Sequence, residues 1–247
     1  MLRKFFLNLL LLISVSTAPL LSKESCSNCL GSGFLVGAYG TFHVFEFHTK
    51  DNVFALPTVQ SELWEYDAFQ RAPGGGSFIG WGVPFCERLN LAFKAAVTGY
   101  ASEAQYSYFD FNPTLSFPNK MRVRYVVDLS LEPGVRIGNC LLLSVKFGPS
   151  YVGWRQVRQI IDNTLPLPVL DEDEQYFRNW GYEFGATANI SITRGTSAFI
   201  EFDGHSYPIN NSKRRIVENV SGFNDFLEYR VTHLYGFGFR FGLMAQF

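Results

Sequence analysis

Long hydrophobic segments are scarce in this sequence, although 47% of its 247 residues are hydrophobic. The apolar run Phe5–Val15 is interrupted by Asn8 and Ser14, and it is too short for a transmembrane helix, which needs about 20 apolar residues. No later segment offers the roughly 18 uninterrupted apolar residues that indicate a spanning helix. We therefore expect no helical membrane anchor after export, which leaves a soluble exported protein or a barrel.

Sequence features of many enzymes and of nucleic-acid-binding proteins are also missing. The formal net charge is −1 and the basic residues form no stripe, which argues against a nucleic-acid partner. The sequence contains no P-loop, no dinucleotide fingerprint and no pair of histidines at a metal-binding spacing. No segment of useful length repeats its apolar residues at the helical period. We therefore expect no cofactor and no metal.

Aromatic residues and glycine are abundant instead, with 25 Phe, 12 Tyr and 22 Gly. This bias suits β structure and the aromatic girdles of membrane barrels. At the start, Arg3 and Lys4 precede the apolar run, as in a secretory signal peptide. We assign residues 1–22 to the signal peptide, without fixing its cleavage site, residues 23–33 to a periplasmic leader and residues 34–247 to a barrel.

The last stretch of the chain shows the clearest strand pattern. From Tyr235 to Phe247 every odd position is apolar, whereas the even positions are small or polar apart from Met244. This period of two predicts a β-strand with one apolar face. In a membrane barrel that face meets lipid, and the other face meets a packed polar interior. About 9–11 residues cross a bilayer as a tilted strand, so roughly Phe237–Phe247 is long enough.

The same alternation recurs along the chain and predicts eight strands. They lie at about 34–47, 77–85, 90–102, 120–132, 140–154, 179–191, 197–205 and 228–247. Long connections at 49–76, 103–119, 155–178 and 206–227 alternate with short ones at 86–89, 133–139 and 192–196. Such alternation is typical of an up-and-down barrel with long outside loops, short periplasmic turns and periplasmic termini. The predicted fold class is all-β, an eight-stranded antiparallel up-and-down transmembrane β-barrel.

The overall pattern resembles the small bacterial outer-membrane β-barrel family, a porin family typified by the opacity proteins and the transmembrane domain of outer membrane protein A. The likeness rests on GFLVGAYGTF at Gly33–Phe42, LSLEPGVRIGNCLLLSVKFGPSY at Leu129–Tyr151 and YGFGFRFGLMAQF at Tyr235–Phe247. In that family a last strand ending in Phe is read by the barrel assembly machinery. The resemblance implies an assembly signal at Phe239, Phe241, Leu243 and Phe247, although Ala245 stands where many members have Tyr.

Ten charged residues lie on the strand faces opposite the apolar ones. They are Lys94, Arg122, Arg124, Asp128, Glu132, Lys146, Glu183, Glu201, Asp203 and Arg240. A lysine or arginine that faces lipid at mid-depth costs about 2–4 kcal/mol, so these faces should point inward. An eight-stranded barrel is only wide enough to be filled by side chains, so the charges must pair with one another. We expect a network that plugs the lumen. A narrow pore with salt bridges that re-pair is the alternative.

One cluster raises an enzymatic alternative, because some outer-membrane barrels hydrolyse lipid A with a His, a Ser and a carboxylate. Glu201, Asp203, His205 and Ser206 offer these groups. His205 and Ser206 are adjacent, however, so on a strand they point to opposite faces. We interpret the cluster as a polar strand end at the loop rim and expect no enzymatic activity.

The four cysteines are Cys26, Cys29, Cys86 and Cys140. The C-x-x-C pair has neither the further ligands of a zinc site nor the βαβ context of a thioredoxin-like site. In the predicted topology all four cysteines lie at the periplasmic end, in an oxidising compartment. We expect disulfides there, within the chain or to envelope neighbours, with free thiols as the alternative.

Together these patterns predict an integral protein of the bacterial outer membrane with a structural or surface-interaction role. Its expected partners are outer-membrane lipid and lipopolysaccharide, the barrel assembly machinery and disulfide-linked envelope neighbours. Acidic residues 171–174 and basic residues 213–215 in two long connections indicate either solvated tips or surface recognition. The alternatives are a narrow pore, a lipid-A-modifying enzyme and a soluble lipocalin-like barrel, whose charges would face water.

Overall fold

The computed structural model describes residues 30–55, 60–85, 88–109, 115–138, 140–162, 169–218 and 224–247. These residues form an all-β structure. Its strands are β1 (Gly33–Ala55), β2 (Gln60–Pro84), β3 (Leu89–Tyr100), β4 (Ala104–Phe109), β5 (Leu115–Ile137), β6 (Leu141–Asp162), β7 (Val169–Thr193), β8 (Thr196–Glu218) and β9 (Asn224–Gln246). Both β3 and β4 pair with β5, so they are the two halves of one barrel strand that is interrupted at 101–103. The described barrel therefore has eight strand positions.

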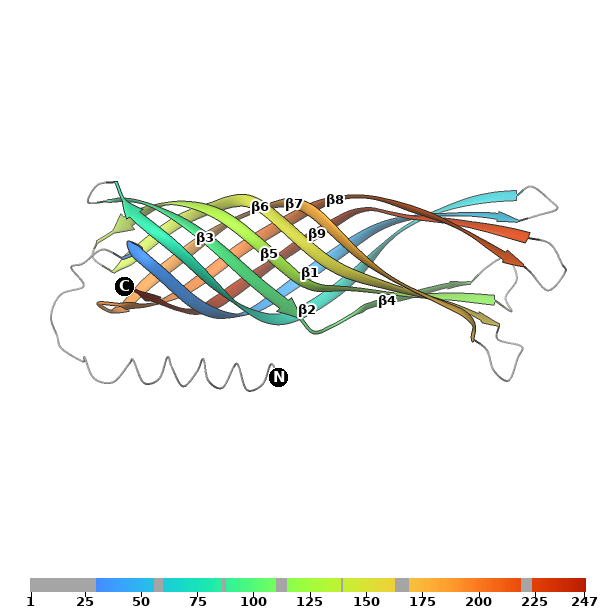
Figure 1. Cartoon of the computed structure of the whole chain (residues 1–247), viewed down its shortest axis with the longest axis horizontal. Helices are drawn as coiled ribbons and strands as arrows, with labels where there is room; N and C mark the ends of the chain where they lie inside the picture. The colour runs from blue at the N-terminus through green and yellow to red at the C-terminus, as the bar shows by residue number, and fades with distance from the viewer. Residues whose placement is uncertain are drawn as a thin grey trace.

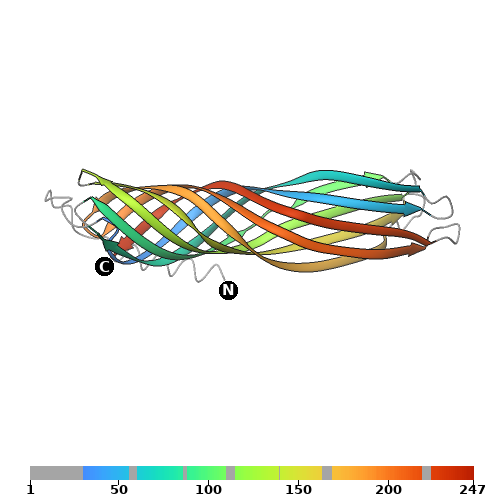
Figure 2. The ribbon, with the colours of Figure 1, turned by 90° about the horizontal axis from the view of Figure 1, so that it is seen from above.

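The strands close into a ring. Every neighbouring pair is antiparallel, the order is β3-β2-β1-β9-β8-β7-β6-β5-β4, and the pairing of β3 with β5 completes the circle. Figures 1 and 2 show an elongated barrel whose strands are inclined to its long axis. The start of β1, the C-terminus and the short connections lie at one end (Figure 1). The predicted up-and-down fold class is confirmed. Among the described residues, no helix is long and apolar enough to cross a membrane.

The prediction of four long connections is wrong, because most of the residues assigned to them belong to strands. The β1–β2 ladder continues to the pair Ala55 and Gln60, and the β8–β9 ladder continues to Glu218 and Asn224. In a membrane barrel, apolar alternation marks the part of each strand whose outer face meets lipid. Backbone N–H and C=O groups need partners along the whole hairpin, so pairing continues where the side-chain signal has ended. The connections lie at 56–59, 110–114, 163–168 and 219–223.

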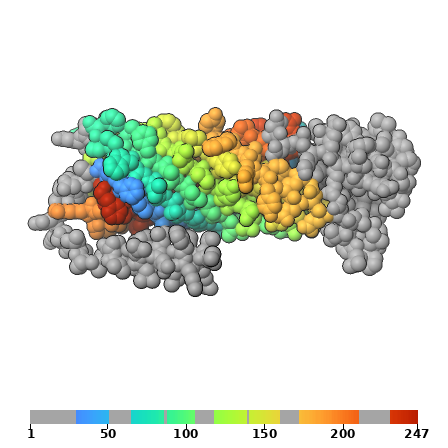
Figure 3. Space-filling view, in the orientation of Figure 1, coloured from blue at the N-terminus to red at the C-terminus, as the bar shows by residue number. Residues whose placement is uncertain are grey.

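The outer wall of the barrel is apolar. Phe93, Phe147, Phe202 and Phe241 expose 50–61% of their surfaces, and each points outward from its strand. In Figure 3 the coloured strands form a continuous wall on the face shown. The inner wall carries the buried charges, which is the reverse of a lipocalin-like barrel and the arrangement of a transmembrane one.

The interior is layered along the barrel axis. One apolar cluster lies near the end of the barrel that holds the start of β1 and the C-terminus, called the terminal end below. It consists of Leu35, Tyr39, Phe78, Ala92, Ala96, Phe199 and Met244. Towards the other end, a larger apolar cluster includes Phe45, Phe47, Tyr100, Met121, Trp154, Tyr207 and Leu234. The order of residues along β1 places His43 between these two clusters, and the order along β8 does the same for Asp203. A polar layer therefore separates two apolar ones.

Candidate functional site

Eight of the ten charged residues that the sequence predicts to face inward meet in the polar layer. They are Lys94, Asp128, Glu132, Lys146, Glu183, Glu201, Asp203 and Arg240. The side chain of Lys94 is 9% exposed, and the others are almost fully buried. They come from β3, β5, β6, β7, β8 and β9, so the network ties most of the ring together through the interior.

Arg240 lies at the centre of this network. Its Nη2 atom is 2.7 Å from Oδ2 of Asp128 and 2.7 Å from Oδ2 of Asp203, and its Nη1 atom is 3.2 Å from Oε1 of Glu201. The guanidinium also lies over the ring of Tyr39, at 5.3 Å from the ring centroid. One arginine of β9 thus links strands β5 and β8 across the lumen. A planar group with five donors suits this task.

The two lysines complete the pairing. Nζ of Lys146 lies 2.7 Å from Oε2 of Glu183 and 2.7 Å from Oε1 of Glu201, which joins β6 to β7 and β8. Nζ of Lys94 lies 2.6 Å from Oε2 of Glu132 and joins β3 to β5. Removing one partner of such a buried ion pair would strongly destabilise the fold, because the remaining charge would be left without compensation.

Arg122 and Arg124 do not join the network, so their predicted positions are wrong. The pairing of β5 with β6 shifts between Val123 and Tyr125, which makes Arg124 the extra residue of a bulge. A bulge reverses which face the following residues take. Val123 and Val126 are therefore both buried, whereas Arg124 is exposed. Arg122 is half-buried and contacts Glu103 at 3.8 Å, away from Arg240.

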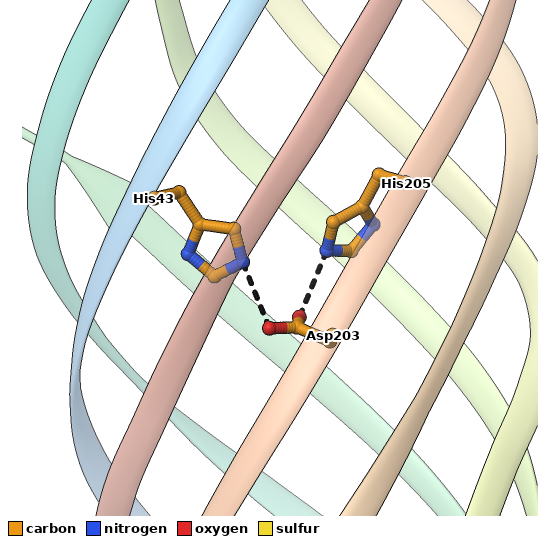
Figure 4. A group of neighbouring side chains, drawn as sticks. All are labelled: His43, Asp203 and His205. Carbon is orange, nitrogen blue, oxygen red and sulfur yellow. Dashed lines mark hydrogen bonds and ion pairs between the residues drawn. The ribbon is translucent and has the colours of Figure 1, made fainter.

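Two histidines enter the site from β1 and β8, the strands on either side of β9 (Figure 4). Nε2 of His43, on β1, lies 3.0 Å from Oδ1 of Asp203, and Nε2 of His205 lies 2.9 Å from Oδ2 of the same carboxylate. Both rings are fully buried, so His205 is not at a loop rim as predicted, because β8 continues well past it. His43 is not among the site residues predicted from the sequence. The alternation of residues along β1 could have indicated its position, because His43 lies on the face opposite the apolar one.

Hydroxyl groups surround His205. The Ser150 hydroxyl donates to Asp128 at 2.6 Å, and the Tyr207 hydroxyl lies 2.6 Å from Ser150 and 3.1 Å from Nδ1 of His205. Ser150, His205 and Asp203 thus contain the groups of a hydrolase triad. All three are fully buried, and the Ser150 proton is directed at a different carboxylate. Ser206, the serine considered from the sequence, points to the outer side, opposite His205.

The same atoms suit an arginine better than a metal ion. Donor atoms of His43, Asp203 and His205 lie within 4.8 Å of one another, as do those of Asp128, Glu183 and His205. Nη2 of Arg240 already contacts Asp203 at 2.7 Å and lies 3.4 Å from Nε2 of His205. A cation that bound these atoms would meet the guanidinium charge at close range. We therefore assign no metal to this cluster.

Two other predicted residues, Cys140 and Phe247, lie near the end of the barrel that holds the C-terminus. Cys140 is half-buried beside the β5–β6 turn, and its carbonyl accepts a hydrogen bond from the Ser191 amide at 2.8 Å. Cys26, Cys29 and Cys86 lie outside the described residues, as do residues 1–22, so the disulfides and the signal peptide stay predictions. Phe247 exchanges two backbone hydrogen bonds with Phe34, at 3.0 and 3.1 Å.

Comparison with known proteins gives matches of fold alone. No family model matches the chain, and no curated protein matches it. The attachment invasion locus protein Ail of Yersinia pestis is 9% identical, covers 81% of this chain and 98% of its own, and has a TM-score of 0.30. The outer membrane protein OprG of Pseudomonas aeruginosa is 9% identical, with 89% and 99% covered and a TM-score of 0.41.

The outer membrane protease OmpT of Escherichia coli is 10% identical, with 90% of this chain and 100% of that chain covered and a TM-score of 0.40. The chain is thus similar to small bacterial outer-membrane β-barrels. Likeness at these identities and TM-scores carries no information about what this chain binds or does.

Proposed function

We propose that the protein is an integral outer-membrane β-barrel with a structural or surface-interaction role and a plugged interior. The observation that carries this proposal is the distribution of apolar and charged residues across the wall. Phe202 points outward and is 61% exposed, whereas its neighbour Asp203 points inward and is 0% exposed. An apolar belt around the whole molecule would drive aggregation in water, and a bilayer covers it.

Three features support the proposed plug. The polar layer is a chain of ion pairs centred on Arg240, and it lies between two apolar clusters. At the terminal end, Leu30 is buried in the mouth of the barrel, where its carbonyl accepts a hydrogen bond from Arg136 at 3.2 Å. Asn90 donates to the Gly31 carbonyl at 2.9 Å. Ions would have to displace packed side chains to pass.

We place the termini and the short connections on the periplasmic side and the extended hairpin ends outside the cell. This orientation rests on the asymmetry between the long strand extensions at one end and the short turns at the other, as in other barrels of this type. We further propose that the barrel assembly machinery reads the last strand, in which Phe239, Phe241 and Leu243 face outward and Phe247 is 79% exposed. Disulfide-linked envelope neighbours remain part of the same proposal through the four cysteines.

Membrane fractionation and gel mobility test the location. The protein should be recovered with the outer membrane, and unboiled samples should migrate differently from boiled ones, because a closed barrel resists detergent until it is heated. Planar-bilayer recording tests the plug, and we expect no discrete conductance steps. Steps that persist for purified folded protein would favour the narrow pore instead. Recovery in the soluble fraction with identical mobilities would contradict the membrane proposal itself.

The outer wall also offers a site for lipopolysaccharide. On β5 the outward positions are mainly apolar from Ile137 to Val127, and the exposed Arg124 follows them. Its guanidinium reaches across β6 to lie 5.6 Å from the ring centroid of Tyr176 on β7, two residues from the exposed Arg178. Two outward arginines beside an aromatic ring, just beyond the apolar belt, suit the phosphate groups of an outer-leaflet glycolipid.

Binding of lipid A to the detergent-folded barrel tests this surface. We expect the double variant Arg124→Ser and Arg178→Ser to bind diphosphorylated lipid A at least several-fold more weakly than the parent protein. Arg88→Ser, an exposed arginine at the terminal end, serves as the control and should bind normally. Equal binding of dephosphorylated lipid A by the parent protein would show that the arginines do not read phosphate.

No enzymatic function is proposed. A hydrolase needs its nucleophile within reach of substrate, and Ser150 is 0% exposed in the packed interior. Mass spectrometry of lipid A from cells with and without the protein tests this point. A change in acyl or phosphate content that depends on Ser150 would revive the lipid-A-modifying alternative.

A further inference from the structure

The charges of the buried network do not balance if its histidines are neutral. The carboxylates are Asp128, Glu132, Glu183, Glu201 and Asp203, and the permanent cations are Lys94, Lys146 and Arg240. Within the described polar layer the carboxylates thus exceed the lysines and arginine by two charges. Uncompensated charge in a desolvated interior is strongly unfavourable. The remaining titratable groups with ring nitrogens directed at these carboxylates are His43 and His205.

The contacts of His43 suit a ring that carries a proton on each nitrogen. The Thr41 hydroxyl donates to the Phe239 carbonyl at 3.0 Å, and a hydroxyl has a single proton. Thr41 Oγ1 can therefore only accept from Nδ1 of His43, which lies 2.7 Å away. On the other side of the ring, Nε2 faces Oδ1 of Asp203 at 3.0 Å, and an ionised carboxylate only accepts. A ring with a proton on each nitrogen would donate to Thr41 on one side and face Asp203 as a cation on the other.

A longer chain of donors leads to the same result for His205. The Ser150 hydroxyl donates its proton to Asp128 at 2.6 Å, so the Tyr207 hydroxyl must donate to Ser150. Tyr207 then has only acceptor capacity left for Nδ1 of His205, which lies 3.1 Å away. Nε2 faces Oδ2 of Asp203 at 2.9 Å. His205 also needs a proton on each nitrogen.

Other groups face these rings from the surrounding strands. Around His43, the Tyr100 hydroxyl of β3 lies 3.4 Å from Nδ1 and adds a neutral partner. Arg240 of β9 lies 3.4 Å from Nε2 of His205 and opposes a positive ring. Oδ1 of Asp128 on β5 lies 3.7 Å from Nδ1 of His205, and Glu183 of β7 is paired with His205 in the sheet, so both favour it.

Lys146 on β6 is paired with Glu183 and Glu201, so its charge is already shared with two carboxylates.

We propose that the barrel interior is a two-proton binding site. His43 and His205 are both imidazolium in the folded protein and contact Asp203 of β8, one from β1 and the other from β8 itself. The protons bring the network to five positive and five negative charges, and the donor counting, which also takes Asp128 and Asp203 as ionised, agrees with this state.

The two-proton site rests on the proposed plug only for its functional consequence, which is that the protons help to keep the interior closed. Removing one proton from each ring leaves the layer with two uncompensated negative charges, and it leaves each ring a single N–H group to share between Asp203 and the hydroxyl on its other side. The contact from β1 to β8, which passes over the inner face of β9, is then weakened. The interior would open first at this contact, because β1 and β8 are not neighbours and are both paired with β9.

Nitrogen NMR of the full chain, folded in micelles with ¹⁵N-labelled histidine, tests the site. At pH 7 we expect both ring nitrogens of His43 and of His205 to give protonated-type signals. His48 and His233 lie on the outer side and serve as internal controls. The variants His48→Gln and His233→Gln assign the control signals without disturbing the interior, so the two buried histidines are assigned by elimination. An unprotonated-type signal from either buried ring at pH 7 would overturn the proposal.

Bilayer recording of the same preparation separates the two proposals. A conducting barrel with both rings protonated would refute the plug and leave the two-proton site standing. A silent barrel with a neutral buried histidine would refute the two-proton site and leave the plug standing.

Discussion

Gly238 of β9 lies directly opposite His43 of β1, and a Cβ atom at Gly238 would be 2.6 Å from Cγ of the His43 ring. The pattern repeats one step along the ladder, where a Cβ atom at Gly236 would be 2.6 Å from Cε1 of Phe45. Inward glycines of the last strand thus leave room for inward rings of the first. Ring closure between the two ends of the chain depends on this match in size.

Gly238→Ala should therefore destabilise the folded barrel by about 1–3 kcal/mol, the usual cost of overpacking. The added methyl group would also lie 2.4 Å from the Phe42 carbonyl oxygen, so backbone as well as ring must shift. Urea titration of the barrel in lipid vesicles measures the change. Gly99→Ala is the matched control, because its nearest neighbours would be 4.0 Å away. Equal losses in the two variants would show that the space beside His43 is not limiting.

Arg240→Met should cost about 3–5 kcal/mol in the same titration, because Asp128 and Asp203 lose their shared cation. Adding Asp203→Asn should recover part of that loss, since it removes one of the stranded charges. Arg88→Met, at an exposed site, should change stability by no more than about 0.5 kcal/mol. If the losses from Arg240→Met and Asp203→Asn simply add, the two side chains are not energetically coupled.

Phe241→Arg should impair folding into a bilayer by about 2–4 kcal/mol, because it places a cation against lipid near mid-depth. Phe247→Arg lies on the same face at the strand end, where the cost should be about 0–1 kcal/mol. Met244→Arg should also be harmful, because Met244 packs in one apolar cluster with Leu35, Phe78 and Phe199. Refolding titrations compare the three variants. A larger loss at Phe247 than at Phe241 would place the membrane at the wrong depth.

Cys140 reports which end of the barrel faces the periplasm. A variant that keeps Cys140 and replaces the other three cysteines with Ser should react with a membrane-impermeant maleimide only after the cells are permeabilised. Partial burial will slow the reaction, so labelling in denaturant provides the total. Labelling of Cys140 in intact cells would invert the barrel and move the extended hairpin ends to the periplasm. In the parent protein, a mobility shift on reduction would reveal disulfides that include the cysteines outside the described residues.

Strand identity and the inward charges were readable from the sequence because their causes are local. A strand turns its side chains alternately to two faces, and lipid excludes charge from one of them. The alternation of Arg240 with Phe239 and Phe241 therefore indicates both a strand and its orientation. The same reasoning placed Lys94, Asp128, Glu132, Lys146, Glu183, Glu201 and Asp203 inside.

Only the tertiary structure decided which of these groups meet. The bulge at Arg124 moves an arginine to the outer wall, and a bulge has no signature in residue alternation because it changes the pairing register rather than the residue types. The contact of His43 with Asp203 joins strands 160 positions apart, and it depends on how far each strand is offset from the next around the ring. Alternation fixes the face of a residue, whereas register fixes its height, and the buried site requires both.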